Sequence, residues 1–203
     1  MAERAPRKDA VRNRAAVLAA ADTLFARHGS PGDLTMGDIA EAAGVGKGTL
    51  FRAFGDRAGL LRELYAARLQ PLWEAVESGP SPLGPGTPPR ERVPALLDAL
   101  LCFKLDNRSL ALALEEGGSG SSPYRADHYE RWREVLSAAL AEIPGLAESD
   151  FTAHVLLAAV RADLVEHLAG SEGVPRESLR ARLAGFTAQL IGSGRPPGVP
   201  ADG

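Results

Sequence analysis

The chain has 203 residues, of which 45% are hydrophobic and 24% charged, and its formal net charge is −3. This is the composition of a globular protein with a real core, and no apolar run approaches the roughly 18 to 20 residues of a membrane-spanning helix. The basic N-terminus leads into an alanine-rich amphipathic pattern, unlike a signal peptide, and the single cysteine, Cys102, excludes an internal disulfide. We therefore expect a cytoplasmic protein.

The charge is unevenly distributed along the chain. Residues 1–68 hold eleven Lys/Arg and eight Asp/Glu, a net charge of +3, whereas the remaining residues carry −6. A basic head on an acidic body is the asymmetry expected when one end of a protein faces phosphate.

The pattern of residues predicts an all-α protein, because Ala, Leu, Arg and Glu dominate and β-branched runs are few. The first long helix is expected over 7–28, with Gly29 at its C-terminal cap. Thr35 follows as the N-cap of a short helix that ends at Ala42, and Gly44-Val45 makes a tight turn into a second short helix over 46–54. The basic side chains that precede Ala15 form a segment that either reaches toward the DNA backbone or minor groove or is a solvated tail: Arg4, Arg7, Lys8, Arg12 and Arg14.

The segment 35–54 carries the signal for function. Two helices that cross steeply need a small residue at their crossing, which Ala40 supplies, and a turn residue that tolerates positive φ, which Gly44 supplies. Ile39, Val45, Leu50 and Phe54 then point into the shared core, so Lys47, Gly48, Thr49, Phe51 and Arg52 are left on the outer face. A helix of this size fits the major groove of DNA. The alternative is an ordinary helical hairpin, as many all-α proteins contain.

Six more helices are expected after the motif, with a Pro/Gly-rich loop at 78–90 and a flexible loop at 117–122: 57–78, 91–105, 109–116, 124–142, 150–169 and 175–191. These bring the total to about nine helices. The division predicted is a helix-turn-helix DNA-binding domain over 7–56, a helical ligand-binding and dimerisation domain over 57–192, and a disordered Gly/Pro tail over 193–203.

The stretch from Thr35 to Leu64 resembles the signature of the TetR family of transcriptional regulators. The shared pattern is a threonine cap, Ile-Ala, Ala-Gly-Val, a Gly-Thr-Leu-aromatic stretch, Phe, a basic residue and Leu, and the likeness extends over residues 10–65. It implies a three-helix DNA-binding head and a body that dimerises and holds a small-molecule effector. It also implies repression as the mode of regulation and duplex DNA with a palindromic operator as the partner. The family positions that touch DNA correspond to Thr35, Lys47, Gly48, Thr49, Phe51, Arg52 and Arg57.

Two positions depart from the family pattern. Phe51 stands where tyrosine is common, and Ala53 stands where histidine is common. Neither side chain can donate to a phosphate, so the resemblance predicts fewer phosphate contacts than is usual. This departure leaves open a second reading, a helical dimerisation or interaction protein whose DNA-binding head is vestigial.

The body offers candidates for an effector site and for a dimer face. Candidate effector contacts are polar or aromatic residues on apolar central helices: Trp73, Phe103, Asn107, Glu115, His128, Trp132, His154 and Arg161. Each has a plainer explanation: the tryptophans as core, Asn107 as the cap of the next helix, the histidines as satisfied core or surface groups. The last two helices present apolar faces and are expected to pair with a second copy, although the same faces could simply close the core.

An enzyme is the least favoured class. The chain has no His-x-x-x-His or Cys-x-x-Cys spacing for a metal, no Gly-x-Ser-x-Gly, and no P-loop or dinucleotide fingerprint, so we expect neither catalysis nor a cofactor. Cys102 stands among Leu101, Phe103 and other apolar residues, which favours a buried, inert thiol.

Overall fold

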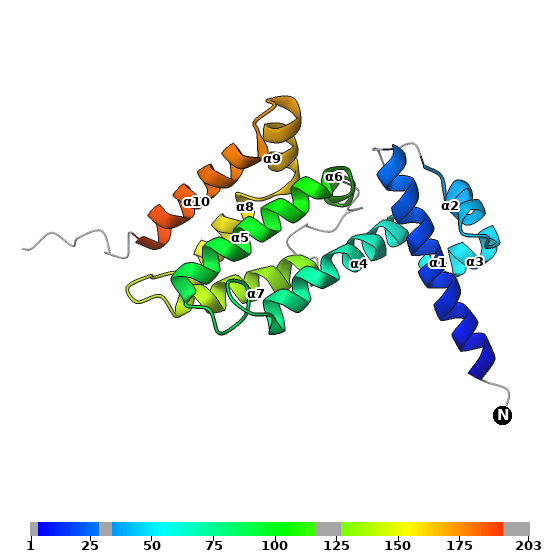
Figure 1. Ribbon diagram of the computed structural model, residues 1–203, viewed down its shortest axis with the longest axis horizontal. Coiled ribbons are helices and arrows are strands. Elements are labelled where there is room, and N and C mark those ends of the chain that lie inside the picture. The colour runs from blue at the N-terminus through cyan, green and yellow to red at the C-terminus, as the bar shows by residue number, and fades with distance from the viewer. Residues whose placement is uncertain (1–3, 29–33, 117–126, 193–203) are drawn as a thin grey trace, which may run out of the picture. The chain divides into compact units, whose positions relative to one another are not determined.

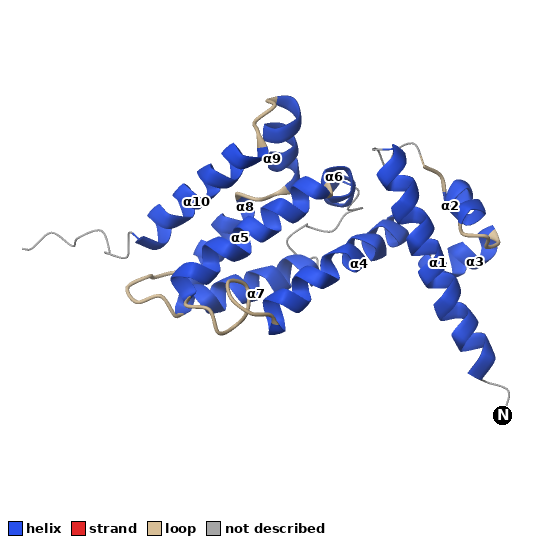
Figure 2. Ribbon diagram, viewed as in Figure 1, coloured by secondary structure: helices blue, strands red, loops and turns tan. Residues whose placement is uncertain are grey.

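The structure is a computed structural model that describes residues 4–28, 34–116 and 127–192. All regular structure in these residues is helical, as predicted (Figures 1 and 2). The N-terminal helices are α1 (Arg4–His28), α2 (Met36–Ala42), α3 (Lys47–Phe54) and α4 (Arg57–Ser78). The later helices are α5 (Pro89–Asp106), α6 (Arg108–Glu116), α7 (Asp127–Ala141), α8 (Ser149–Ala158), α9 (Ala162–Glu166) and α10 (Arg176–Gly192). The predicted cap at Gly29, the loop at 117–122 and the tail at 193–203 lie outside the described residues.

The chain forms two compact units. One comprises Met1–Gln70 and Ser109–Gly117, and the other comprises Pro71–Arg108 and Gly118–Gly203. Helix α4 contributes to both, because the division falls between Gln70 and Pro71. No helix in the described residues has the length and apolarity needed to cross a membrane.

The first unit packs α1, α2 and α3 around one apolar core (Figure 1). Its buried side chains recur at every fourth residue of α1 and continue into the next three helices: Val17, Ala21, Phe25, Leu34, Met36, Ile39, Ala40, Leu50, Phe54, Leu60, Leu61 and Leu64. The spacing of four on α1 brings one stripe of that helix against its neighbours. Val11, by contrast, is exposed, so this apolar residue of α1 lies outside the core.

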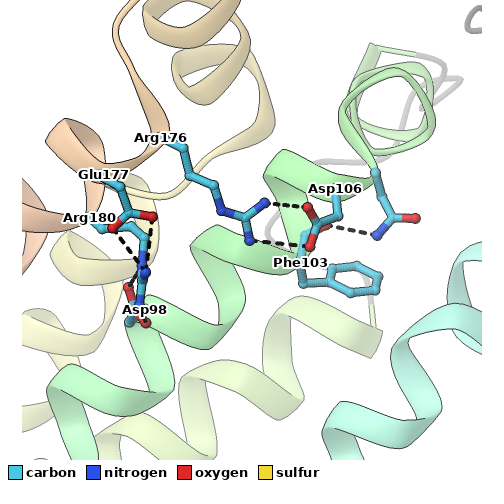
Figure 3. Close-up of polar contacts among 7 residues, drawn as sticks. Asp98, Phe103, Asp106, Arg176, Glu177 and Arg180 are labelled. Atoms are coloured by element: carbon cyan, nitrogen blue, oxygen red, sulfur yellow. Dashed lines mark hydrogen bonds and ion pairs between the residues drawn. The ribbon is translucent and has the colours of Figure 1, made fainter.

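The second unit is built on two close helix pairs, α7 with α8 and α5 with α10. Ion pairs fasten α10 to α5: Arg180 Nε donates to Asp98 Oδ1 at 2.7 Å, and Arg176 pairs with Asp106 (Figure 3). The partners repeat at intervals of eight on α5 and four on α10, so each set lies on one face of its helix. Cys102 lies between the two aspartates in sequence and is half-buried, so the expectation of a buried thiol was wrong.

The predicted helix over 150–169 is interrupted, which is the main error in the expected secondary structure. Its first part ends as α8 at Ala158, because the amides of Val160 and Arg161 bond to carbonyls three residues back and Arg161 adopts an extended backbone (φ −61°, ψ 146°). The chain then continues as α9 and a π-helical turn, His167–Ser171. Val160 and Ala162 are both buried. Residues two apart lie on opposite sides of a continuous helix, so the break lets both enter the core.

Candidate nucleic-acid interface

A capping box fixes the start of α2. The side-chain oxygen of Thr35 accepts from the amide of Asp38 at 3.2 Å, and the Asp38 carboxylate accepts from the amide of Thr35 at 2.9 Å. These bonds satisfy amides that have no partner within the helix. The predicted cap is confirmed, and the Thr35 hydroxyl is already engaged in it, since it also donates to Asp38 Oδ2 at 2.7 Å.

The turn between α2 and α3 is as tight as the sequence predicts. Gly44 has a φ of +65°, a conformation that residues with a Cβ rarely adopt. The amide of Val45 reaches back to the carbonyl of Ala40 at 3.0 Å, and Ala40 is buried at the crossing of the two helices. The chain therefore leaves α2 and enters α3 within a few residues, as in a helix-turn-helix.

Helix α3 has one buried side and one open side. Leu50 and Phe54 face the core, while five of the predicted contact residues are exposed: Lys47, Gly48, Thr49, Phe51 and Arg52. Gly46 caps the helix through its carbonyl, which accepts from the amide of Thr49 at 2.9 Å. The open side thus combines two cationic side chains, a hydroxyl, an aromatic ring and bare backbone at Gly48.

Lys47 leans toward the start of α2. A methyl group at Gly37 would lie 3.2 Å from the Lys47 Nζ, so the lysine occupies the space that a side chain at Gly37 would fill. This contact brings a cation next to the capped end of α2. No sequence pattern singles out Gly37.

Arg57, the last of the predicted contact residues, is half-buried at the start of α4. Its Nε donates to the backbone carbonyl of Leu34 at 3.3 Å, directly before Thr35. The side chain therefore ties the beginning of α4 to the beginning of α2, and part of its role is to position the head.

Arg14 of α1 connects α3 to α4. Its Nη1 donates to the carbonyl of Ala53 at 2.9 Å, its guanidinium lies 4.9 Å from the centre of the Phe54 ring, and it pairs with Glu63 on α4. One side chain of α1 thus joins the C-terminal turn of α3 to α4. The expectation that Arg14 belongs to a DNA-reaching or solvated segment was wrong, because these contacts hold it within the fold. Farther along α4, Arg68 donates to Asp22 of α1 at 2.6 Å.

The candidate effector residues fall into separate groups. Trp73 and Trp132 are buried and lie in contact, with ring centroids 4.4 Å apart and ring planes tilted by 33°, and the Trp132 Nε1 has no hydrogen-bond acceptor among the described residues. Asn107 ends α5 and donates to the carbonyl of Phe103 at 2.8 Å, so it caps the helix before it; that it also caps the helix after it stays a prediction.

The other candidates point to surface networks. His154 bonds to Tyr129 and lies 3.9 Å from Asp150, Arg161 pairs with Asp163, and His128 is exposed. The side chain of Glu115 lies outside the described residues. Within the described residues, these contacts join Trp73 to Trp132 and Phe103 to Asn107. His154 and Arg161 instead contact Tyr129 and Asp163.

A capped short helix, a tight glycine turn and a second short helix with an open basic side define a helix-turn-helix DNA-binding protein. Comparison with known proteins agrees with this class. The family described as bacterial regulatory proteins, tetR family, matches residues 17–64. An HTH-type transcriptional regulator of Staphylococcus aureus (strain MRSA252) is 23% identical over 184 residues, which cover 89% of this chain and 95% of that relative. Residues 17–64 thus match the model of the tetR family, and the chain is similar over most of its length to a transcriptional regulator.

Solved structures share the fold across nearly the whole chain. A tetR-family regulatory protein from Rhodococcus RHA1 is 17% identical, has a TM-score of 0.62 and is matched over 88% of this chain and 96% of its own. NalD, the secondary repressor of the MexAB-OprM multidrug efflux pump in Pseudomonas aeruginosa, is 18% identical, with a TM-score of 0.55 over 90% and 97% of the two chains. At these identities the likeness extends to the fold and not to the ligand or the operator.

Proposed function

We propose that this protein is a homodimeric, cytoplasmic repressor that binds a palindromic operator through α3 and releases it when a small molecule binds its body. The observation that supports DNA binding most strongly is the division of α3 into a buried side and an open basic side. A repressor is the mode implied by the family, and NalD is an example among proteins of this fold.

Within this proposal, seven residues contact DNA: Thr35, Lys47, Gly48, Thr49, Phe51, Arg52 and Arg57. Lys47 and Arg52 supply charge to phosphates or base edges, and Thr49 positions the helix on the backbone. Thr35 and Arg57 act mainly by holding the start of α2, because both already bond within the head. Residues 7–56 serve as the DNA-binding domain and 57–192 as the regulatory domain.

Dimerisation is proposed through the outer sides of α8 and α10. Phe151 on α8 is 66% exposed and Phe186 on α10 is 40% exposed, while Leu156, Leu179 and Leu183 close the core of the protomer. Large apolar side chains in water favour burial against a partner. A Phe151→Glu, Phe186→Glu double variant is expected to run as a monomer in light-scattering measurements. Val11→Glu, which changes an equally exposed residue of α1, is the matched control and is expected to remain dimeric.

The proposed switch uses α4, which contributes to both compact units. Arg14 and Arg57 attach α3 and α2 to this helix, so a shift of α4 carries the recognition helix with it. Two heads must lie about 34 to 36 Å apart to occupy successive major grooves. Effector binding that changes this spacing by a few ångströms therefore lowers operator affinity.

Selection of bound duplexes from a random pool tests DNA recognition directly. A palindromic site is expected, and its affinity is expected to fall steeply with salt. Lys47→Ala and Arg52→Ala should weaken binding, whereas Lys104→Ala, which removes the same charge from α5, should not. If no duplex is retained even at low salt, the head is vestigial and the protein acts through helical interactions alone.

A small-molecule screen by thermal shift, followed by operator binding measured with each hit, tests the switch. A compound that raises the melting temperature and lowers operator affinity is the expected effector. Compounds that stabilise the protein without any change in operator affinity would contradict the switch and leave DNA binding intact.

A further inference from the structure

Phe51 is an aromatic side chain placed where the fold does not use it. It lies on the open side of α3 and is 48% exposed, while Leu50 and Phe54 fill the core beneath the same helix. Exposing half of a phenyl ring to water is unfavourable, in proportion to the apolar area left uncovered. Contact with a partner would therefore bury apolar area of Phe51 that the fold leaves exposed.

The residues near Phe51 on α3 are a glycine and two exposed cations. Gly48 lies one turn before it on the same side of α3, and a Cβ added at Gly48 would meet no atom within 4 Å. Lys47 is also one turn back, and Arg52 is its neighbour in sequence; both are exposed. A phenyl ring beside bare backbone thus lies on a helix that also carries two exposed cations, which suits contact with DNA.

The chemistry of phenylalanine restricts what it can recognise there. Its ring has no donor or acceptor, so it bonds neither to phosphates nor to the polar edges of bases. The major groove displays one apolar group, the C5-methyl of thymine. We propose that the Phe51 ring, with the open backbone at Gly48, contacts the C5-methyl group of a thymine in each half-site. The inference rests on the proposed function, in which α3 enters the major groove.

Replacing thymine by deoxyuridine tests the proposal, because only the methyl group is removed. The duplex obtained by selection is resynthesised with deoxyuridine at each thymine in turn, and affinity is measured for wild type and Phe51→Ala. One thymine per half-site is expected to lose about fourfold in affinity on replacement, the effect of one buried methyl group. Phe51→Ala is expected to bind less tightly and to have lost this sensitivity. Phe51→Leu, which keeps an apolar side chain, should retain part of it.

Three results would overturn the inference. One is a selected half-site without thymine, and another is an equal response of wild type and Phe51→Ala to every replacement. The third is a uniform loss of affinity in Phe51→Ala with no response of wild type to deoxyuridine, which would assign the ring to a sugar contact. Circular dichroism of each variant separates these outcomes from misfolding. Failure to select any duplex is a different result: it removes the proposed DNA recognition itself, and the methyl contact with it.

Discussion

Replacing Gly48 by alanine should change stability and DNA binding in opposite directions. Glycine inside a helix is less favourable than alanine by about 1 kcal/mol, and the added Cβ meets no atom within 4 Å. Gly48→Ala should therefore stabilise the folded protein by about 0.5 to 1 kcal/mol, which corresponds to a rise of roughly 1 to 4 °C in melting temperature for a chain of this size.

The same methyl group projects from the open side of α3, where the proposed DNA backbone or base edge approaches. Forcing an extra methyl group into a packed contact costs about 1 to 3 kcal/mol, so operator affinity should fall by roughly 5- to 150-fold. Thermal denaturation and fluorescence anisotropy with a labelled duplex measure the two effects on one protein sample. Gly86→Ala is the control, because Gly86 lies in the loop between α4 and α5 and its added Cβ also meets nothing within 4 Å.

Stability should rise while operator affinity falls, so the two measurements separate an effect on folding from an effect on DNA binding. If Gly48→Ala stabilises the protein and binds the operator as tightly as Gly86→Ala does, then Gly48 does not lie against DNA. If Gly48→Ala destabilises the protein, then the space beside Gly48 is not open, contrary to the structure.

Three further variants test the contacts of Arg14, the ion pair of Glu166 and the charge of Lys47. Arg14→Ala removes a bond to a helix-end carbonyl, a ring contact and a partly exposed ion pair, so it should destabilise the head by about 1 to 2 kcal/mol in urea denaturation. Arg12→Ala, which loses only an exposed pair, should stay within about 0.5 kcal/mol of wild type. The hydrogen bond from Arg108 lowers the pKa of Glu166, so this carboxylate stabilises the fold above its ordinary pKa of 4.5 and loses that contribution as the pH falls through its lower folded value. The stability difference between wild type and Glu166→Gln should thus be constant from about pH 7 to 5 and shrink below that; a difference that grows toward acid would refute the pairing. Lys47→Ala should reduce the slope of log affinity against log salt by about 1 per protomer, and an unchanged slope would mean that Lys47 touches no phosphate.

Local rules in the sequence were enough to predict the helix-turn-helix. Thr35 with Asp38 gives a cap, Gly44 gives positive φ, and Ala40 gives a close crossing, and each depends on residues only a few positions apart. The start and end of α4 were also predicted as the structure has them. Residues close together in the sequence determine these features, so they can be predicted from a single sequence.

Contacts between distant residues were not predictable in the same way. Nothing near Arg14 indicates that its partners are Ala53 and Glu63, so a basic residue near the N-terminus was taken for a DNA-reaching or solvated one. The break before Ala162 has no proline or glycine to announce it, since it arises from the burial of residues on both sides of the break. Residue type and helical context already favoured the core for Trp132, but for the histidines they left both a core and a surface position open, and His128 is exposed.

The Trp73–Trp132 pair gives the protein an intrinsic spectroscopic signal. Trp73 and Trp132 are the two tryptophans of the chain, and their rings are 4.4 Å apart with a tilt of 33°. Indole transitions at this separation couple, so the pair should produce circular dichroism bands of opposite sign that vanish when the rings part. Both tryptophans belong to the second compact unit, and tryptophan emission therefore reports on that unit alone. Separation of the two rings in the second unit can therefore be followed by spectroscopy, without a label, while the head is bound to an operator.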